Sequence, residues 1–366
     1  MDPGAYPVQV IATLGTPEGP QEIALDSFLL VYDPAAKTVP VVLVARVTGQ
    51  PLSDANGLFV ADPGRFTRAR DDVSRLASWV LGRRTARVTL AVSPLLLEEW
   101  RDIADGYEFT GPEGAEKIPA DAPVPRSYLA ALELLSRAVD TGRLELLSLG
   151  YADPDLSQLR AHGRIDDVAA QYARGSAAIS RAAETSASSG TASAGGCVPA
   201  AAASMLVDRG VRYAVVSDTC AVSRDATAES GVFAVGSTGL TALVADSALT
   251  DSLRTGEASQ ALATALVRNA TGERSPLIIN GELGASGGTV ADFTRVADTL
   301  STAPWLQLRL GGEVAAVNTR STVKLHTAPD NDDSPTGYWD DVAGARAASG
   351  GLSFAMGATD PTASSA

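Results

Sequence analysis

A short unit recurs along this chain and limits the folds that it can adopt: an apolar run, then polar residues, then a helical pattern. In the clearest copy, LELLSLGYADPDLSQL at 144–159, the apolar run ends at Gly150 and leads through Tyr151, Asp153 and Asp155 into a helical pattern. The other copies are Ala86–Val92 before Ser93, Tyr213–Val216 before Ser217 and Asp218, Thr241–Ala245 before Asp246, and Leu277–Ile279 before Asn280, Gly281 and Glu282. Short buried strands that alternate with helices predict parallel βαβ units.

The number of these units favours a closed barrel over an open sheet. Val39–Val47 is the best candidate for the first buried strand, and six to eight units fit into the roughly 270 residues that follow. No GxGxxG follows this first strand, and neither GxxxxGKS nor GxxxxGKT occurs, which argues against a dinucleotide-binding Rossmann fold and a P-loop. We therefore predict an α/β fold with a β/α barrel at 38–312.

The two ends of the chain do not follow the βα pattern. Tyr6–Thr13 alternates, Gly15–Pro20 is rich in turn residues, and Ile23–Tyr32 is again apolar, which predicts a β-hairpin within 1–35. This hairpin resembles the last two strands of an immunoglobulin-like module, although it could equally be a hairpin that packs on the barrel. Residues 313–366 are predicted to form a C-terminal extension with a polar surface loop at 321–336, one helix at 338–348 and a flexible tail.

Composition excludes several classes of partner. The 366 residues carry a net charge of −14, which disfavours binding to nucleic acid and to anionic membranes. No window has the apolar length of a transmembrane helix, and no signal peptide follows Met1. We expect an extracytoplasmic soluble chain with its leader removed, tethered to a membrane in the full-length protein. The Ala-, Arg- and Asp-rich usage indicates a high-GC genome.

Five carboxylates directly follow predicted strands, where the ends of parallel strands would bring them to one rim. They are Asp153, Asp155, Asp218, Asp246 and Glu282. Helix capping and turn formation offer a structural explanation for the aspartates. Asn280 joins them as a predicted ligand-binding residue, and Tyr151 and Trp305 are predicted either to form a sugar-stacking platform or to pack in the protein.

The cysteines and histidines are few. Cys197 and Cys220 lie in loops after two strands that should be neighbours, which predicts a disulfide with a Cα separation of about 4.4–6.8 Å in an oxidising compartment; two buried thiols are the alternative. His162, followed by Gly163, is predicted to end a helix. The sequence predicts neither a metal site nor a cofactor, because neither histidine follows a barrel strand.

One segment lacks bulky residues. Thr185–Gly196 is rich in Ser, Gly and Ala, so it offers little apolar surface to bury. We therefore expect a mobile loop there, with 185–193 dispensable for folding.

Four stretches carry a resemblance to a known family. VTLAVSPLLLEEW, LELLSLGYADPDLSQL, GGCVPAAAASMLVDRGVRYAVVSD and SPLIINGELGASGG resemble strand motifs of family 57 glycoside hydrolases, which are relatives of the polysaccharide deacetylases. The resemblance covers Val39–Leu310 and implies a seven-stranded (β/α)7 barrel. Similar barrels occur in secreted or membrane-tethered actinobacterial envelope proteins, often beside immunoglobulin-like modules.

The catalytic motifs of this family are missing. The resemblance places its nucleophilic glutamate on the unit Gly195–Ala203, which contains no carboxylate here. The family's acid is an aspartate where this chain has Asn280, with Glu282 two residues further on. Arg46–Gln50 lacks the histidine motif expected after the first strand, and a zinc deacetylase would need an Asp/His/His set.

These departures set the expected function. We expect a non-catalytic or vestigial carbohydrate-active barrel of the cell envelope that binds a cell-wall glycan or serves as a scaffold. The first alternative is a glycoside hydrolase or transglycosylase that uses Glu282 with Asp153, Asp155 or Asp218, since such enzymes need two carboxylates. The second is a protein–protein interaction module of an envelope assembly, which would bind an envelope protein.

Overall fold

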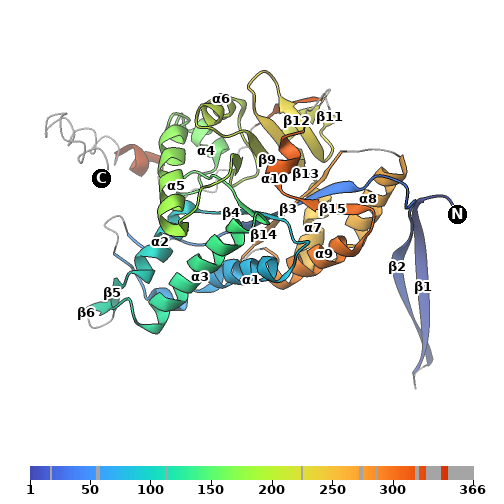
Figure 1. The fold of residues 1–366 in the computed structure, drawn as a ribbon, viewed down its shortest axis with the longest axis horizontal. Coiled ribbons are helices and arrows are strands. Elements are labelled where there is room, and N and C mark those ends of the chain that lie inside the picture. Colours follow the sequence, from blue (N-terminus) through green and yellow to red (C-terminus); the bar gives the residue numbers. More distant parts are fainter. Residues whose placement is uncertain are drawn as a thin grey trace.

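The computed structural model consists of a β/α body with a β-hairpin projecting from it (Figure 1). The structure describes residues 1–16, 19–54, 58–111, 114–223, 226–271, 275–284, 287–317, 321–326 and 339–344. The predicted flexible tail lies outside these residues, and of the predicted C-terminal helix only 339–344 is described. Within the described residues, no helix combines the length and hydropathy that a membrane span requires.

The body is the predicted seven-stranded barrel, closed by hydrogen bonds. Its strands, in order around the barrel, are β3 (Val39–Val47), β4 (Val88–Val92), β7 (Leu144–Leu146), β8 (Gly190–Ala192), β9 (Tyr213–Ser217), β13 (Thr241–Ala245) and β14 (Leu277–Leu283). Between β7 and β8, the amides of Ser188 and Ser148 donate to the carbonyls of Leu146 and Gly190 at 2.7 and 2.8 Å. Between β13 and β14, the Asp246 amide donates to the Ile278 carbonyl at 3.1 Å. These bonds complete the circuit and confirm the predicted (β/α)7 barrel.

Every second residue of these strands points into the barrel, as the period of two requires. The interior cluster consists of Val42, Val44, Ala91, Leu147, Leu149, Ala192, Tyr213, Val215, Leu243, Ala245, Ile278 and, from the short helix α10 (Gly311–Ala315), Val314. The same alternation carries Arg46 on β3 and Asn280 and Glu282 on β14 to the carboxyl-terminal end of the barrel. The polar rim therefore follows from the position of the apolar interior.

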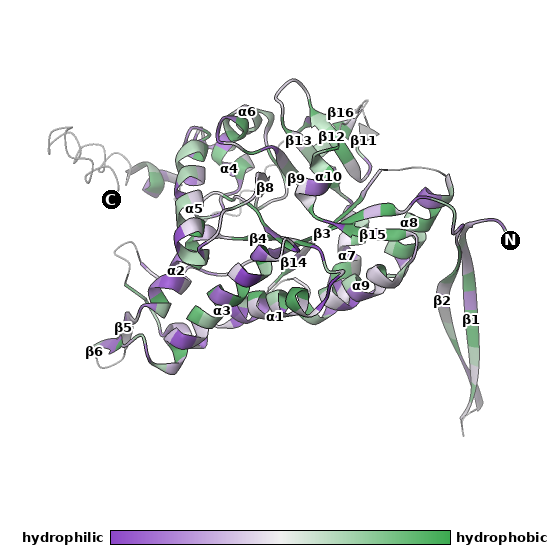
Figure 2. Cartoon of the chain, in the orientation of Figure 1, coloured by the Kyte–Doolittle hydropathy of each residue, from purple (hydrophilic) through white to green (hydrophobic). Residues whose placement is uncertain are grey.

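Helices cover the outside of the barrel and build the larger core. They are α1 (Arg68–Gly82), α2 (Pro94–Ala104), α3 (Pro123–Asp140), α4 (Leu156–Ala161), α5 (Asp167–Ala183), α6 (Ala200–Asp208), α7 (Ser247–Thr255), α8 (Ser259–Thr271) and α9 (Val290–Thr302). Hydrophobic and hydrophilic residues alternate along them with the period of amphipathic helices (Figure 2). His162 caps the C-terminus of α4, as predicted, and its ring stacks on Trp339 at 4.2 Å.

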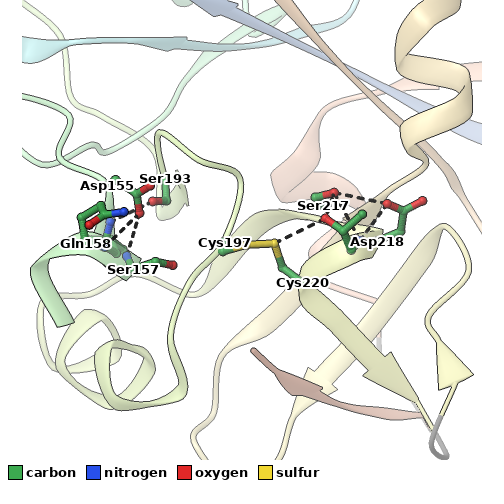
Figure 3. Close-up of a disulfide and its surroundings, with 10 residues drawn as sticks. Asp155, Ser157, Gln158, Ser193, Cys197, Ser217, Asp218 and Cys220 are labelled. Carbon is green, nitrogen blue, oxygen red and sulfur yellow. Dashed lines mark hydrogen bonds between the residues drawn. A yellow bond between two sulfur atoms is a disulfide. The ribbon is translucent and has the colours of Figure 1, made fainter. Parts of the chain in front are cut away.

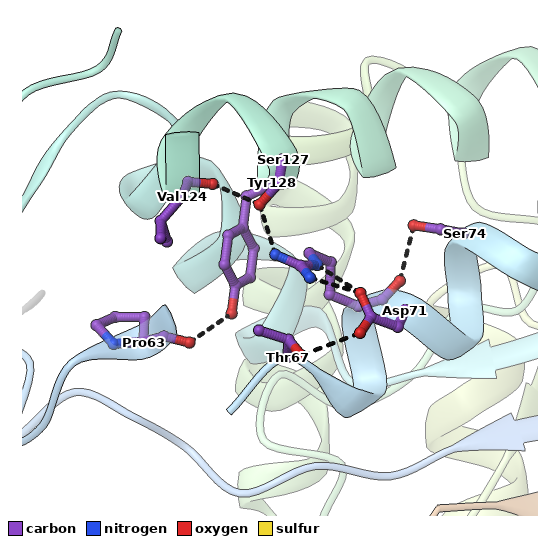
Figure 4. A network of polar contacts seen from close by, with 8 residues as sticks. Pro63, Thr67, Asp71, Ser74, Val124, Ser127 and Tyr128 are labelled. Carbon is purple, nitrogen blue, oxygen red and sulfur yellow. Dashed lines mark hydrogen bonds and ion pairs between the residues drawn. The ribbon is translucent and has the colours of Figure 1, made fainter. Parts of the chain in front are cut away.

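A polar network fastens α1 to α3 (Figure 4). The fully buried Tyr128 of α3 donates to the Pro63 carbonyl at 3.1 Å, and the Arg70 guanidinium lies 4.8 Å over its ring. Arg70 also donates to Asp71 and to Ser127. Burial raises the pKa of Tyr128 to about 12, so this phenol stays a neutral donor at physiological pH.

Additional strands extend the sheet beyond β13. β12 (Gly231–Val235) pairs antiparallel with β13 as a hairpin. β16 (Thr322–Leu325) then pairs with both β12 and β10 (Ala221–Ser223). The predicted surface loop at 321–336 was therefore wrong for its described part, because Val323 and Leu325 are buried against strands about a hundred residues earlier in the chain.

Further elements were missed or are short. A hairpin of β5 (Tyr107–Gly111) and β6 (Gly114–Ile118) connects α2 to α3. β15 (Leu306–Arg309) pairs with the first half of β3. β4 pairs with the second half of β3 along the same edge. β11 (Ala226–Thr227) pairs with β10.

The predicted mobile loop at 185–196 was wrong, since it contains the barrel strand β8. Gly190, Thr191 and Ala192 are all buried. The residues are small because the Tyr213 side chain of the neighbouring strand fills the space above them. A Cβ added to Gly190 would overlap with the Tyr213 ring. Small residues here mark close packing, which composition alone cannot distinguish from a flexible linker.

The N-terminal hairpin consists of β1 (Gly4–Thr16) and β2 (Gly19–Val31), paired antiparallel in a ribbon of thirteen residue pairs. Its root contacts α8, and the rest projects from the body (Figure 1). The immunoglobulin-like character of this hairpin, and the division of the chain into three parts, stay predictions.

We predict that Gly190→Ala destabilises the protein by at least about 2 kcal/mol, because the added methyl group meets the buried Tyr213 ring inside a closed barrel. Denaturant unfolding followed by circular dichroism measures this change. Gly82→Ala is the matched control, since nothing lies within 4 Å of a Cβ at that position. Equal stability of the two variants would contradict the assigned packing of β8.

Candidate functional site

A cavity of about 530 Å³ lies at the carboxyl-terminal end of the barrel, which we call the rim pocket. Its polar side chains are Arg46, Thr48, Ser93, Asp153, Ser193, Thr250, Asn280 and Glu282, and the loop after β8 adds Ala194, Gly195 and Gly196. Open ends of parallel strands are where β/α folds place ligands. Three of the predicted site residues, Asp153, Asn280 and Glu282, line this one pocket.

An ion pair between Arg46 and Asp153 crosses the pocket floor. Arg46 stands on β3, and Asp153 lies in the loop after β7, 107 residues later; their side chains are only 10% and 14% exposed. Arg46 also donates to the Ser193 carbonyl at 3.2 Å, which ties in the loop after β8. Asp153 has a φ of 50°, in the left-handed region that aspartate tolerates better than most residues. The guanidinium thus joins β3 to two separate loops, the one after β7 and the one after β8.

The environment of Asp153 is electrostatically balanced. Burial raises the pKa of the Asp153 carboxyl above its ordinary value, while the Arg46 guanidinium opposes this rise. The nearby carboxylates of Asp155 and Glu282 raise it further. The influence of Glu282 places its charge close to Asp153, so the pocket holds two carboxylates and one guanidinium.

Glu282 differs from Asp153 in being exposed. Its backbone belongs to β14 and pairs with Arg46 of β3 in the ladder. Among the described residues, no side chain or amide donates a hydrogen bond to its carboxylate. Glu282 is therefore the accessible carboxylate of the rim pocket.

The other predicted rim carboxylates serve local structure. Asp155 caps α4 by accepting from the amides of Ser157 and Gln158 at 2.7 and 3.4 Å. Asp246 accepts from the amides of Ala248 and Leu249 at 3.0 and 3.1 Å at the start of α7. Asp218 accepts from the Ser247 amide and hydroxyl at 3.0 and 2.9 Å. Asp218 and Asp246 line a separate cavity beside α8, so the barrel does not bring them to Glu282.

Tyr151 and Trp305 pack within the protein, which is the second of the two alternatives that the sequence left open. The Tyr151 hydroxyl donates to Glu98, and Arg174 lies 3.9 Å over the Tyr151 ring, between α2 and α5. Trp305 precedes β15, packs on Tyr32 at 5.2 Å, and lies at the amino-terminal end of the barrel. The two rings are at different ends of the strands and neither lines the rim pocket.

The predicted disulfide joins Cys197 to Cys220 with a Cα separation of 5.4 Å (Figure 3). The two cysteines follow the paired strands β8 and β9, which confirms the expected neighbourhood. The bridge begins directly after Gly196, whose carbonyl accepts from the Ser217 amide at 2.9 Å. It therefore fixes the wall of the rim pocket to the next barrel strand.

No carboxylate occupies the loop between β8 and α6, where the resemblance places the parent nucleophile. Residues 193–199 read SAGGCVP, and all of them are described. Nor does the part of the chain that the structure describes contain three His, Cys, Asp or Glu side chains grouped as a metal site. The pocket's chemistry consists of Arg46, Asp153, Asn280 and Glu282.

Sequence reasoning missed Arg46 and Ser193. Arg46 is the only charged residue in the run VPVVLVARV, and it continues the inward alternation of Val42 and Val44. A charged residue at the next inward-facing position of a buried strand was a usable signal for a polar group at the rim. Ser193 could not be found, because its segment was interpreted as a loop.

Comparison with solved structures supports the barrel assignment. The chain is similar to a 4-alpha-glucanotransferase from Thermococcus litoralis, with a TM-score of 0.57, 15% identity, and coverage of 80% of this chain and 43% of the other. It is also similar to the alpha-amylase AmyC from Thermotoga maritima, with a TM-score of 0.53, 11% identity, and coverage of 81% of this chain and 78% of the other. A GH57 branching enzyme from Thermococcus kodakaraensis gives a TM-score of 0.55, 11% identity, and coverage of 80% of this chain and 73% of the other. The chain thus spans less than half of the glucanotransferase. At these identities the likeness establishes the fold, a GH57-type barrel.

No protein-family model matches the chain, and no curated protein matches it. The assignment of the barrel therefore rests on the structure and its neighbours. Function has to be argued from the site itself.

We predict that Arg46→Met destabilises the protein by about 3 kcal/mol at neutral pH, because it leaves the Asp153 carboxylate buried without its partner. Chemical unfolding measures the loss. Arg46→Met combined with Asp153→Asn should recover most of it. Arg83→Met is the control, since the Arg83–Asp298 pair is 45% and 40% exposed and should contribute at most about 1 kcal/mol.

The same variant should depend on pH with a defined sign. In Arg46→Met the folded-state pKa of Asp153 is raised by burial without opposition, so the folded state binds the proton more tightly than the unfolded state. The folded variant is favoured below the unfolded-state pKa and loses stability as pH rises through the raised value. The deficit relative to the parent should therefore shrink on acidification; a deficit independent of pH would contradict an unpaired carboxylate.

Proposed function

We propose that this chain is a carbohydrate-binding barrel of the cell envelope that holds a glycan in the rim pocket and does not hydrolyse it. The observation that carries the proposal is the state of the pocket's carboxylates. One, Asp153, is buried in an ion pair with Arg46, and the other, Glu282, is accessible. The unit on which the resemblance places the family's nucleophile, Gly195–Ala203, contains no carboxylate.

Glycoside hydrolysis needs more than this pocket offers. A retaining enzyme uses one carboxylate as nucleophile and a second as acid and base, while an inverting enzyme needs an acid and a base on opposite sides of the sugar. Asp153 is engaged by Arg46 and cannot approach an anomeric carbon without breaking that pair. Glu282 alone supplies one of the two required roles.

The lining suits a polyhydroxylated ligand. Arg46 and Asn280 provide donors, Glu282 and Asn280 provide acceptors, and Ser93 provides both. Because none of the described residues that line the pocket is aromatic, hydrogen bonds rather than ring stacking would supply the specificity.

A glycoside hydrolase or transglycosylase is the second candidate, and one observation favours it. Asp153 and Glu282 line the same pocket, and the Glu282 carboxylate raises the pKa of Asp153. Such an enzyme would use Glu282 as one catalytic carboxylate and release Asp153 from Arg46 on substrate binding.

An extracytoplasmic place in the envelope is supported by the disulfide, since such bonds persist in oxidising compartments. The net charge of −14 suits a soluble protein that does not bind nucleic acid or anionic lipid. A glycan of the cell wall is the ligand class that fits this location.

We predict that the chain binds at least one glycan among α- and β-linked glucans, mannans and arabinogalactans on an array, and releases no reducing sugar from any of them. Glu282→Gln should weaken the binding about tenfold or more by calorimetry, since a hydrogen bond to a charged group contributes about 1.5–3 kcal/mol. Glu257→Gln is the matched control, because Glu257 is exposed and lies outside the rim pocket.

Two results would overturn the proposal. Turnover of a bound glycan that disappears in Glu282→Gln and persists in Glu257→Gln would establish the hydrolase. Absence of binding to every glycan, with the protein folded, would favour the protein–protein interaction module instead.

A further inference from the structure

A second cavity, of about 570 Å³, adjoins the rim pocket, and we call it the flanking pocket. Its characteristic lining residues are Gln50, Arg65, Phe66, Arg68, Trp100 and Gly284. The flanking pocket and the rim pocket share Thr48, Gly49 and Leu96, so they lie side by side at the carboxyl-terminal end of the barrel. Gly49 is exposed and has no side chain, so an extended ligand can pass over it from one pocket into the other.

The flanking pocket is cationic, although the chain as a whole carries a net charge of −14. Arg65 and Arg68 line it, and none of its described lining residues is an aspartate or a glutamate. The rim pocket has the opposite balance, because its described lining contains two carboxylates and one guanidinium. The sign of the charge therefore changes from one pocket to the next.

Both guanidiniums of the flanking pocket are accessible to a ligand. Arg65 is exposed in the turn before α1, and none of the described residues pairs with its side chain. Arg68 donates to the Gly284 carbonyl at 2.6 Å, and its Nε lies 3.8 Å from the Asp72 carboxylate, which is longer than a hydrogen bond. The Arg68 side chain is 56% exposed, so it is anchored at the pocket and retains donors for a ligand.

An aromatic ring lies beside these cations. Phe66 lines the flanking pocket and is 47% exposed. A half-exposed ring at a cavity offers a flat apolar surface on which a sugar ring can pack. None of the described residues that line the rim pocket provides such a surface. The flanking pocket thus combines the groups that bind an anion with a group that binds a sugar.

We propose that the ligand is an acidic glycan, and that an oxyanion on one of its sugars, a carboxylate or a phosphate, binds to Arg65 and Arg68. The inference rests on the proposed function, because it adds a further sugar to the glycan in the rim pocket. The planar fork of an arginine donates two parallel hydrogen bonds to a carboxylate or a phosphate, which makes arginine well suited to both groups.

Glu282 sets the position of the charged sugar. Its carboxylate repels an anionic group in the rim pocket, so a neutral sugar binds there and the charged sugar packs on Phe66. Glu282 lines the rim pocket and Gly284 lines the flanking pocket. Two residues span at most about 7 Å of backbone, so the pockets are close enough for neighbouring sugars of one chain.

Calorimetric titration of the whole chain with matched charged and neutral saccharides tests the inference. The probes are oligogalacturonate with its methyl ester, and a mannose oligosaccharide 6-phosphate with its dephosphorylated form, so carboxylate and phosphate are measured separately. We expect at least one charged probe to bind about tenfold or more tightly than its neutral form, because hydrogen bonds to charged groups are the stronger ones.

The variants locate the anion. Arg65→Gln and Arg68→Gln should each remove most of the advantage of the charged probe, and Phe66→Ala should weaken the charged and neutral forms by a similar factor. Arg84→Gln is the matched control, since it removes the same charge from an exposed arginine before β4, at the opposite end of the barrel. Arg84→Gln should bind like the parent. Because the Arg65 side chain has no partner among the described residues, Arg65→Gln tests binding without disturbing the fold, which circular dichroism checks.

Four results would overturn the inference. Equal affinity for the charged and neutral forms, with binding still weakened by Glu282→Gln, would exclude the acidic glycan and leave the proposed function standing. A preference for charge that persists in both arginine variants, or that Arg84→Gln also removes, would place the anion elsewhere. Binding unaffected by Phe66→Ala would remove the sugar from the flanking pocket. Absence of binding to all four probes would also refute the inference, and the glycan array then decides separately whether the proposed function stands.

Discussion

The closed circuit of seven parallel strands depends on filling a narrow interior with side chains from alternate positions. Tyr213 is the largest of these side chains, and it occupies space that Gly190 on one neighbouring strand and Gly311 in α10 leave empty. The rest of the interior is built from valine, leucine, isoleucine and alanine. A seven-stranded barrel has no room for bulk on every strand, so one aromatic ring imposes small residues around it.

The rim follows from the same alternation. Continuing β3 past Val42 and Val44 brings Arg46 inward at the level where the apolar interior ends, and Asp153 meets it from the loop after β7. A guanidinium at this depth needs a carboxylate and a carbonyl, which Asp153 and Ser193 provide. The requirement to satisfy Arg46 thus shapes the pocket floor. The same requirement holds the Asp153 carboxylate in an ion pair at the pocket floor.

The disulfide and the ribbon constrain the molecule in opposite ways. Cys197–Cys220 holds the Gly195–Gly196 wall on the barrel, so the pocket has a fixed side. The ribbon contacts the body only at its root and leaves an apolar face in water. The rim pocket is thus held in place, whereas the ribbon projects from the body (Figure 1).

The sequence by itself determined the features whose signals are local. Apolar runs and helical periods established the βα alternation, and Asp155 and Asp246 were recognisable as caps because a cap bonds amides two or three residues away. The cysteine pair followed from two neighbouring strand ends. Only the tertiary structure decided the rest. β8 became a strand because Tyr213 packs on it, β16 because β10 and β12 pair with it, and Asp153 became an ion-pair partner because Arg46, 107 residues earlier, faces the same pocket. Each of these depends on a contact distant in the chain, and no local pattern encodes such a contact.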